Sequence, residues 1–501
     1  MLQPLTPTCG LRLYVYEQYE PLLEAILRVG GQMFTLHEPK SEPGVSPSRR
    51  RRLVSNATCF EHDCQYNDFS NATPRVFTGE VPIYQRLVHR CRRVTDPSQA
   101  DLFVVPVPLS SLQVLSWAMG AYMPAKCVVP ELTGWSAAAI RAAEVLPRSM
   151  NRTVETMRKH SFKCRDKLKG QALQLVQQAM HLFRRHRLPL LSARTAPRHL
   201  FLFSNDVQFV PLQMIARDWL NETTLTPLLM RSIVIHLGDD SSTVGPRSRT
   251  QKQPGRYLYN DLTVPYRVSQ WMALGWPPPV LPKRFLLSGN LNGKKSRYRG
   301  QLLRALSSSA QKLGLQAALN LSSSNQPPAI AAQVAAESTF CLAPTGDSKG
   351  FTARLFYALL HGCIPVRVDA FEKRSVSLNF SQVNFPFRSV LDWSRLIINE
   401  GANGLLRNAS GFLRRLRDMP AHEVADRLAY IRNTSRFLSY DLEHPQFPGE
   451  DAPGALIREL ERRVAQLDDP AFVAALEEQQ RKDDRGLLCK SSGDCKPISS
   501  T

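Results

Sequence analysis

The sequence predicts an α/β protein with two domains, each built on a parallel sheet. Its 501 residues are too many for one compact core. Short apolar runs, typical of strands buried on both faces, alternate with helix-like segments along the chain. The proline-dense segment GWPPPVLPKR, which begins at Gly275, is typical of a domain boundary.

The first domain is predicted to span residues 11–275, after an N-terminal extension at 1–10. The alternating segment LRLYVYE, from Leu11, predicts its first strand. Residues from about 38 to 75 lack periodicity and are rich in Pro, Ser and Arg, which indicates an inserted loop. The further predicted elements are a helix carrying Ile83, Leu87 and Val88, strands at Leu102–Val107, from His199 and from Ser232, and helix at 136–188.

The second domain is predicted at residues 281–440, followed by a helical or loose tail at 441–501. RFLLSGN predicts a strand, and the following helix carries Leu302, Leu303 and Leu306. STFCLAP, a glycine-rich loop, a helix from about Thr352 to His361 and the strand IPVRV then make a complete βαβ unit.

The net charge of this chain is higher than that of an average soluble protein. It has 64 Lys and Arg residues against 43 acidic ones, a net charge of +21. Such a balance favours polyanionic partners, although a solvated basic surface explains it equally well. No zinc-finger spacing and no other standard nucleic-acid motif is present, so we do not expect a nucleic-acid partner.

Cysteines and glycosylation sequons indicate the compartment. The ten cysteines form no CxxC pair, and their even number fits either disulfides or reduced buried thiols. Eight N-x-S/T sequons favour the secretory lumen. Asn71 is weakened by Pro74, so the glycosylation candidates are Asn56, Asn151, Asn221, Asn320, Asn379, Asn408 and Asn433. No signal peptide or spanning helix is visible, which conflicts with the lumenal expectation.

The stretch from Phe340 to Asp369 has the pattern of a phosphate-binding loop. Ligands of parallel sheets lie beyond the carboxyl ends of the strands, and the N-terminus of a helix offers free N–H groups to an anion. Arg354, one turn into the helix, can reach the same phosphates with a forked guanidinium. The loop and its neighbours supply the candidate donor-binding residues Thr345, Gly346, Ser348, Lys349 and Gly350. An ordinary strand–loop–helix with Gly346 in a turn would show the same spacing.

A second basic cluster follows the predicted strand RFLLSGN. Its residues are Asn290, Lys294, Lys295, Arg297 and Arg299. If both loops lie at one edge of the sheet they form a single cationic site; otherwise the run is a solvated loop.

Six segments in order resemble the exostosin family, glycosyltransferase family 47. They are LRLYVYE, RVTDPSQADLFVVPVP, PRHLFLFSNDVQF, NDLTVPY (similar to a turn of the family), the stretch from Phe340 to Val368, and SVLDWSRL. The resemblance spans about residues 11–440.

The resemblance implies a GT-B fold, with two Rossmann-like domains facing across a cleft. It also implies an inverting, metal-independent transfer of a sugar from a nucleotide-sugar, taken here as a UDP-sugar, to a glycan in the Golgi lumen. No cofactor or metal is expected, in keeping with the lack of a D-x-D motif. The acceptor could be an acidic polysaccharide, and membrane association and a homo- or hetero-oligomer are compatible with this function.

The resemblance can also be followed at single residues. Arg354 matches the family's diphosphate-binding arginine, and Arg299 matches the basic residue that opens the helix after the strand. Cys341 and Cys363 match a family cysteine pair, which implies a disulfide. Tyr357 departs from the family, which usually has an acidic residue there to bind ribose or sugar hydroxyls. An inactive glycan-binding protein on the same scaffold is therefore the alternative function.

The catalytic base is expected at a strand end of the first domain. Asp206, His236 and Asp239 are the candidates there, and Glu80 is a further one. The sequence does not rank them, and each taken singly also fits a structural role.

Overall fold

The computed structural model describes a large part of both predicted domains. No described helix is both long and apolar enough to cross a membrane. The described residues are 9–23, 80–107, 178, 181–182, 185–186, 188–202, 226–237, 261–266, 278, 280–291, 297–323, 328–345, 351–369, 383–440, 450–475 and 477–478.

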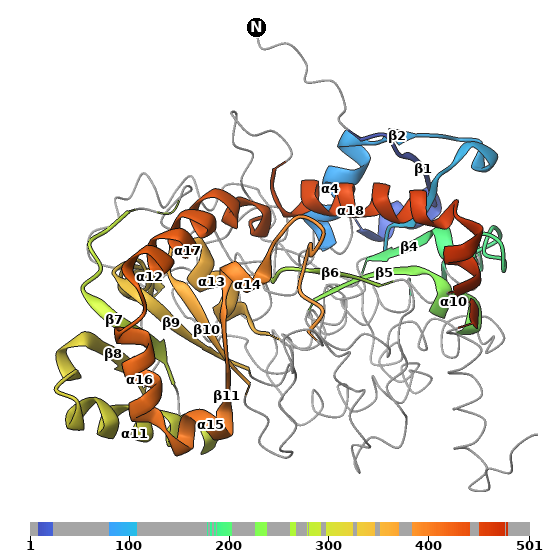
Figure 1. Ribbon diagram of the computed structural model, residues 1–501. Coiled ribbons are helices and arrows are strands. Elements are labelled where there is room, and N and C mark those ends of the chain that lie inside the picture. Colours follow the sequence, from blue (N-terminus) through green and yellow to red (C-terminus); the bar gives the residue numbers. More distant parts are fainter. Residues whose placement is uncertain are drawn as a thin grey trace, which may run out of the picture.

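The described strands form two parallel sheets, shown on the right and the left of Figure 1. The first sheet has the order β2-β1-β3-β4-β5-β6 and the second the order β11-β10-β9-β7-β8. The first comprises β1 (Arg12–Val15), β2 (Arg92–Arg93), β3 (Leu102–Val105), β4 (His199–Leu202), β5 (Ile233–Leu237) and β6 (Asp261–Val264). The second comprises β7 (Phe285–Asn290), β8 (Leu319–Ser322), β9 (Ser338–Pro344), β10 (Ile364–Asp369) and β11 (Ile398–Gly401).

Both sheets repeat the same doubly wound strand order. In each, the second strand lies on one side of the first and all later strands lie on the other. The strand order therefore reverses between β1 and β3 and again between β7 and β9, and ligands of such sheets bind beyond the carboxyl ends at these switch points. Two doubly wound sheets in one chain agree with the predicted α/β class and with a GT-B type of fold.

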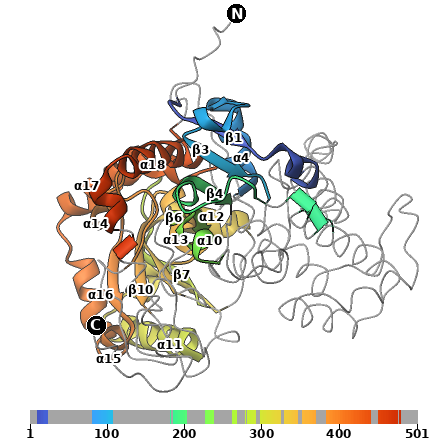
Figure 2. The same cartoon turned by 90° about the vertical axis from the view of Figure 1, so that its right-hand side faces the viewer.

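Helices cover both sheets, as the two views in Figures 1 and 2 show. The predicted helix near Thr352–His361 is α13, which packs on β9 and β10. The described α-helices are α4 (Glu80–Arg90), α10 (Thr226–Arg231), α11 (Arg297–Lys312), α12 (Pro328–Ala336), α13 (Ala353–Leu360), α14 (Trp393–Leu396), α15 (Ala402–Arg407), α16 (Ala409–Arg417), α17 (Ala421–Thr434) and α18 (Ala452–Leu467).

The central strands form because their apolar runs are buried on both faces. Every residue of β3 (LFVV) and of β4 (HLFL) is buried, as expected for inner strands of a parallel sheet. The segment NDLTVPY, likened above to a turn, instead contains strand β6, which pairs in parallel with β5. Strand β6 ends at Val264, so only the last two residues of the segment, Pro265 and Tyr266, can belong to a turn.

The C-terminal helix α18 returns to the first domain, where it packs against α4 and β6 (Figure 1). At its start, Asp451 caps the helix by accepting from the Gly454 N–H at 2.9 Å and pairs with Arg86 of α4 at 2.5 Å. At its end, Arg198 bridges the Asp468 carboxylate and the Asp101 carbonyl oxygen.

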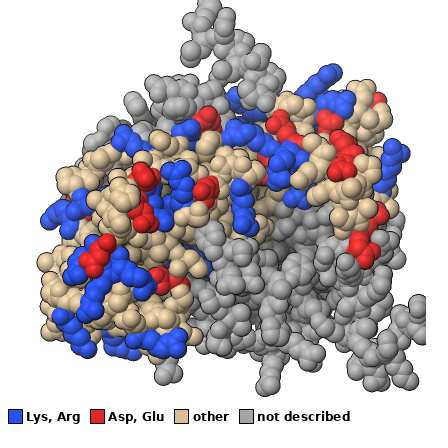
Figure 3. All heavy atoms as spheres, viewed as in Figure 1, with Lys and Arg blue, Asp and Glu red and all other residues tan. Residues whose placement is uncertain are grey.

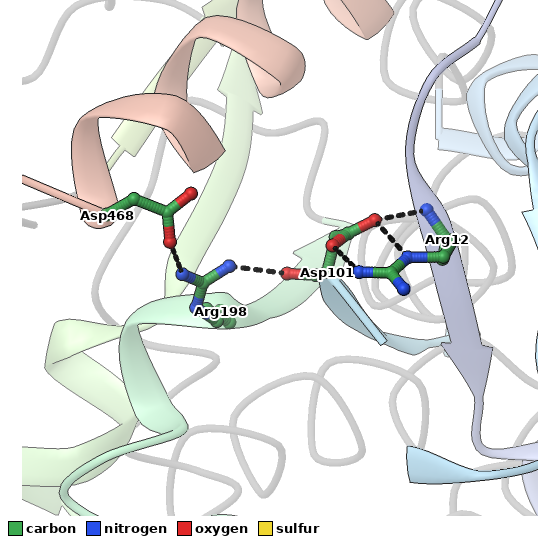
Figure 4. Close-up of polar contacts among 4 residues, drawn as sticks. All are labelled: Arg12, Asp101, Arg198 and Asp468. Carbon is green, nitrogen blue, oxygen red and sulfur yellow. Dashed lines mark hydrogen bonds and ion pairs between the residues drawn. The ribbon is translucent and has the colours of Figure 1, made fainter. Parts of the chain in front are cut away.

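Figure 4 shows that this contact continues to the start of β1. The Asp101 carboxylate accepts hydrogen bonds from the Arg12 backbone N–H at 2.7 Å and from the Arg12 guanidinium at 2.8 and 3.1 Å. Arg12 begins β1, Asp101 precedes β3 and Arg198 precedes β4. The network therefore fixes the amino ends of three strands against α18.

An aromatic cluster joins the carboxyl edge of the first sheet to the second domain. Tyr266, which follows β6, packs against Phe351 and Phe356 at ring-centroid distances of 6.0 and 5.9 Å. Phe351 also stacks on Phe385 at 5.8 Å. Nearby, the Tyr440 hydroxyl donates to the Pro265 carbonyl at 2.7 Å. The first sheet's carboxyl edge is thus packed directly against the segment that starts α13.

Two disulfides are present among the described cysteines. Cys341 of β9 is bonded to Cys363, which precedes β10, confirming the pair implied by the family resemblance. Cys9 is bonded to Cys91, at the end of α4, a pair that the sequence analysis did not make.

Gly289 of β7 is required for the close approach of β7 and β9. A Cβ atom at Gly289 would lie 2.9 Å from the Leu342 Cβ, closer than real Cβ contacts, and at a tight 3.2 Å from its Cδ1. We expect Gly289→Ala to lower the free energy of unfolding by about 1–3 kcal/mol, because the two strands must separate. Urea unfolding measures the change. Gly404→Ala, which meets no atom within 4 Å inside α15, is the control and should not destabilise the protein. Equal stabilities of Gly289→Ala and the wild type would contradict the argument.

Candidate active site

The candidate site lies at the switch point between β7 and β9. Asn290 ends β7, and Thr345 follows β9. The strands run in parallel, with Ser288 opposite Cys341, so both residues reach the carboxyl edge of the sheet. Helix α13 begins a few residues later, after its N-cap Thr352. The carboxyl ends of the two strands that precede the basic loops therefore lie at one edge of the sheet.

Two arginines from different helices come together at this edge. Arg299 lies in the first turn of α11 and Arg354 in the first turn of α13, and both are half-buried. Burial and, second, the neighbouring Arg299 guanidinium lower the pKa of Arg354 to about 10. Within the described part of the chain, the Arg354 guanidinium makes no hydrogen bond or ion pair. Two partly buried guanidiniums that repel each other are stabilised when an anion binds between them.

Two buried polar atoms at the same edge also lack hydrogen-bond partners among the described residues. They are the Asn290 side-chain oxygen at the end of β7 and the Thr352 hydroxyl at the N-cap of α13. The Thr352 side chain does not cap its own helix. Buried groups of this kind are normally paired, so their presence beside two arginines indicates a site for a polar, anionic ligand.

Thr345 is held by β10. Its backbone N–H donates to the Val368 carbonyl at 2.9 Å, and its hydroxyl lies 3.3 Å from the same oxygen. This contact fixes the point where the chain leaves β9. The remaining predicted donor-loop residues, namely Gly346, Ser348, Lys349 and Gly350, lie outside the described residues, as do Lys294 and Lys295.

Tyr357 lies one turn after Arg354 on α13. Its ring packs against His361 at a centroid distance of 4.2 Å, and the His361 Nδ1 donates to the Tyr357 carbonyl at 2.6 Å. Burial raises the pKa of the Tyr357 phenol well above its ordinary value. The side chain is therefore a neutral hydroxyl where the family usually has a carboxylate.

Arg367 of β10 is a further cation in the sheet that the sequence analysis did not single out. The residue is fully buried, and its guanidinium donates to the Asn399 side chain of β11. Opposite it in the register lies Ala343 of β9. The only signal in the sequence is an arginine inside the otherwise apolar strand IPVRV.

Among the candidate bases, His236 and Glu80 are described. His236 lies in β5 and is fully buried, and its Nε2 is 3.5 Å from the Thr263 hydroxyl of β6. Glu80 is fully buried in the first turn of α4. Asp206 and Asp239 lie outside the described residues. Glu17, which the sequence analysis missed, follows β1 beside the first sheet's switch point; its exposed carboxylate pairs with Arg93 at 3.0 Å.

Three of the predicted glycosylation residues are described. Asn408 and Asn433 are exposed, whereas Asn320 is half-buried in the edge strand β8. The Asn408 side-chain oxygen also caps α16 by accepting from the Gly411 N–H at 2.8 Å. The other candidates, Asn56, Asn151, Asn221 and Asn379, lie outside the described residues.

Two doubly wound parallel sheets in one chain agree with a GT-B type of fold. Residues 250–401 match the family model of the Exostosin GT47 domain. The chain thus carries a segment of the exostosin GT47 type, and the resemblance inferred from its motifs is confirmed over that segment.

One solved structure similar to this chain is the crystal structure of the glycotransferase of kitacinnamycin, at 10% identity over 90% of this chain and 98% of that one, with a TM-score of 0.29. No curated protein sequence matches the chain.

Proposed function

We propose that the chain transfers a sugar from a nucleotide-sugar to a glycan acceptor with inversion at the anomeric carbon. The observation that carries the proposal is the arginine pair, Arg299 and Arg354, beside unpaired polar atoms at the β7/β9 switch point. A diphosphate is the anion that fits two guanidiniums and a helix N-terminus. The donor's nucleoside diphosphate would occupy this edge, and UDP is the nucleotide we propose.

In the proposed reaction the acceptor hydroxyl attacks the anomeric carbon while the bond to the diphosphate oxygen breaks. The electron pair of that bond leaves with the diphosphate, and a base of the first domain takes the hydroxyl proton. Arg299 and Arg354 stabilise the negative charge that develops on the leaving group, because their positions are set before the reaction. No metal or cofactor is part of this proposal. The candidates for the base are His236, Asp206, Asp239 and Glu80 from the sequence, together with Glu17.

The acceptor is proposed to bind along the carboxyl edge of the first sheet. This edge contacts the second domain through Tyr266 and Phe351, which brings it next to the segment that begins α13. A donor on the second sheet and an acceptor on the first would then meet between the two edges. The disulfides and the sequons support a lumenal compartment, for which we propose the Golgi.

A panel of UDP- and GDP-sugars, tested without added metal, examines the proposal. We expect one donor class to raise the melting temperature, because a ligand at one hundred times its Kd stabilises the folded state by about 2.7 kcal/mol. The same donor should be turned over when a glycan acceptor is added. A folded protein that no nucleotide-sugar stabilises would instead support the inactive glycan-binding scaffold.

A further inference from the structure

Helices α11, α15 and α16 form one outer layer of the second domain, which we call the cationic layer. α11 packs against both α15 and α16, and α15 packs against α16. Figures 1 and 2 both place the three helices at the same end of the domain. Their sequences, RYRGQLLRALSSSAQK, ANGLLR and ASGFLRRLR, contain eight arginines and lysines and no aspartate or glutamate. Such a bias over three contacting helices differs from the mixed charges of an ordinary surface.

Most of these cations face the solvent. The exposed ones are Arg304, Lys312, Arg407, Arg414, Arg415 and Arg417. Figure 3 shows basic side chains gathered over the part of the molecule where Figure 1 places these helices. Two neighbouring carboxylates compensate part of the charge: Glu400 lies 2.6 Å from Arg415 and Asp418 lies 2.7 Å from Arg417. Six exposed cations against two carboxylates leave a positive surface.

The chemistry of the layer discriminates among polyanions. Its two aromatic rings, Tyr298 and Phe412, are buried, so the layer offers no exposed ring on which unpaired nucleic-acid bases could stack. The exposed large apolar residues among those described are Val280 and Ile330, and neither belongs to the three helices. The layer therefore has no apolar side chain to insert into a bilayer. The layer can therefore bind a partner only through its charged groups.

The cationic layer and the arginine pair of the candidate site share helix α11. α11 carries Arg299 in its first turn, next to Arg354, and exposes Arg304 and Lys312 further along the same helix. The 16 residues from Arg297 to Lys312 correspond to about 24 Å at 1.5 Å per residue. A chain bound along this helix would be held beside the site where the sugar is transferred.

We propose that the cationic layer is a docking surface for a polysaccharide bearing carboxylate or sulfate groups along its chain. The surface binds several repeats of the polymer through exposed guanidinium and ammonium groups, separately from the donor site. Binding at such a surface depends on ionic strength, because it releases condensed counterions. Since it is measured without a donor, docking does not depend on the proposed transfer reaction.

The test compares two triple variants of equal charge change. Arg304→Gln, Arg407→Gln and Arg414→Gln together remove three cations from the layer. Arg92→Gln, Arg388→Gln and Arg432→Gln together remove three exposed arginines from other elements. The probes are polygalacturonate for carboxylate, dextran sulfate for sulfate and neutral dextran, each measured by titration at several salt concentrations. We expect at least a tenfold weaker binding of a charged polymer by the layer variant, with a shallower salt dependence, and wild-type binding by the control.

Each result decides the proposal. Preference for polygalacturonate or for dextran sulfate identifies the anionic group. Equal weakening in both triple variants would show that only net charge matters and would overturn the docking surface. So would equal binding of neutral dextran, or no binding of either charged polymer at low salt. Unchanged melting temperatures of the two variants establish that both are folded.

Discussion

Replacing Arg354 with alanine is expected to lower kcat/KM for the nucleotide-sugar by about 100-fold or more. Arg354 is half-buried beside Arg299, and it makes no hydrogen bond or ion pair to another described residue. A guanidinium that meets a diphosphate in such a site is worth several kcal/mol, because few waters compete with it. Initial rates with the donor identified in the panel measure the effect.

The same substitution should not lower stability. In the free protein, Arg354 is opposed by burial and by the Arg299 charge, so its removal relieves an unfavourable contact. We therefore expect a melting temperature equal to or above that of the wild type, together with the loss of the donor-induced shift. Arg354→Lys keeps the charge but loses the two-pronged geometry and should lie between the two.

Arg432→Ala is the matched control, because Arg432 is exposed on α17 and distant in sequence from the site. It should keep the donor-induced shift and the activity. If Arg354→Ala were destabilised like a core variant and still bound the donor, Arg354 would be a structural residue and the arginine pair would lose its proposed role.

The sequence predicted the elements whose signal is local. STFCLAP, which is buried except at the partly exposed Thr339, is β9, and the helix near Thr352–His361 is α13. Arg299 and Arg354 were named because each follows a strand by a short connection, and the parallel sheet brings such positions to one edge. The Cys341–Cys363 pair came from the family resemblance and is confirmed.

The features that the sequence did not predict depend on distant partners. The Cys9–Cys91 bond joins the N-terminal extension to the end of α4, and no local pattern pairs two cysteines separated by 82 residues. α18 was assigned to a tail, yet its N-cap Asp451 contacts Arg86 of the first domain. Strand β11 (INEG) carries polar residues and pairs with β10 at the sheet edge, so it lacks the apolar run that reveals an inner strand.

The protein is expected to lose stability in mild acid because of His199. The residue is fully buried at the start of β4, and its ring stacks on Phe103 at a centroid distance of 4.9 Å. The Thr195 carbonyl can only accept, so the His199 Nδ1–H donates to it at 2.9 Å. The His199 Nε2 then accepts from the Tyr16 hydroxyl at 2.8 Å. This neutral tautomer satisfies both ring nitrogens.

Burial lowers the pKa of His199 from its ordinary value of 6.5 to about 4 in the folded state. Because the unfolded chain binds the proton more readily, protonation favours unfolding. Stability is therefore complete above pH 6.5 and is lost as the pH falls from 6.5 toward 4. The shift corresponds to about 3 kcal/mol, and urea unfolding at intervals of half a pH unit measures it.

His199→Gln separates this contribution from the carboxylates that titrate in the same range. Glutamine can donate to Thr195 and accept from Tyr16 but cannot take up a proton, so the variant should lose the part of the pH dependence that His199 supplies. We expect the stability difference between wild type and variant to shrink by about 3 kcal/mol between pH 7 and pH 4. His422→Gln, on the exposed face of α17, should leave the wild-type curve unchanged. Parallel curves for the wild type and His199→Gln would mean that His199 is protonated equally in the folded and unfolded states, and the tautomer argued from Thr195 and Tyr16 would be wrong.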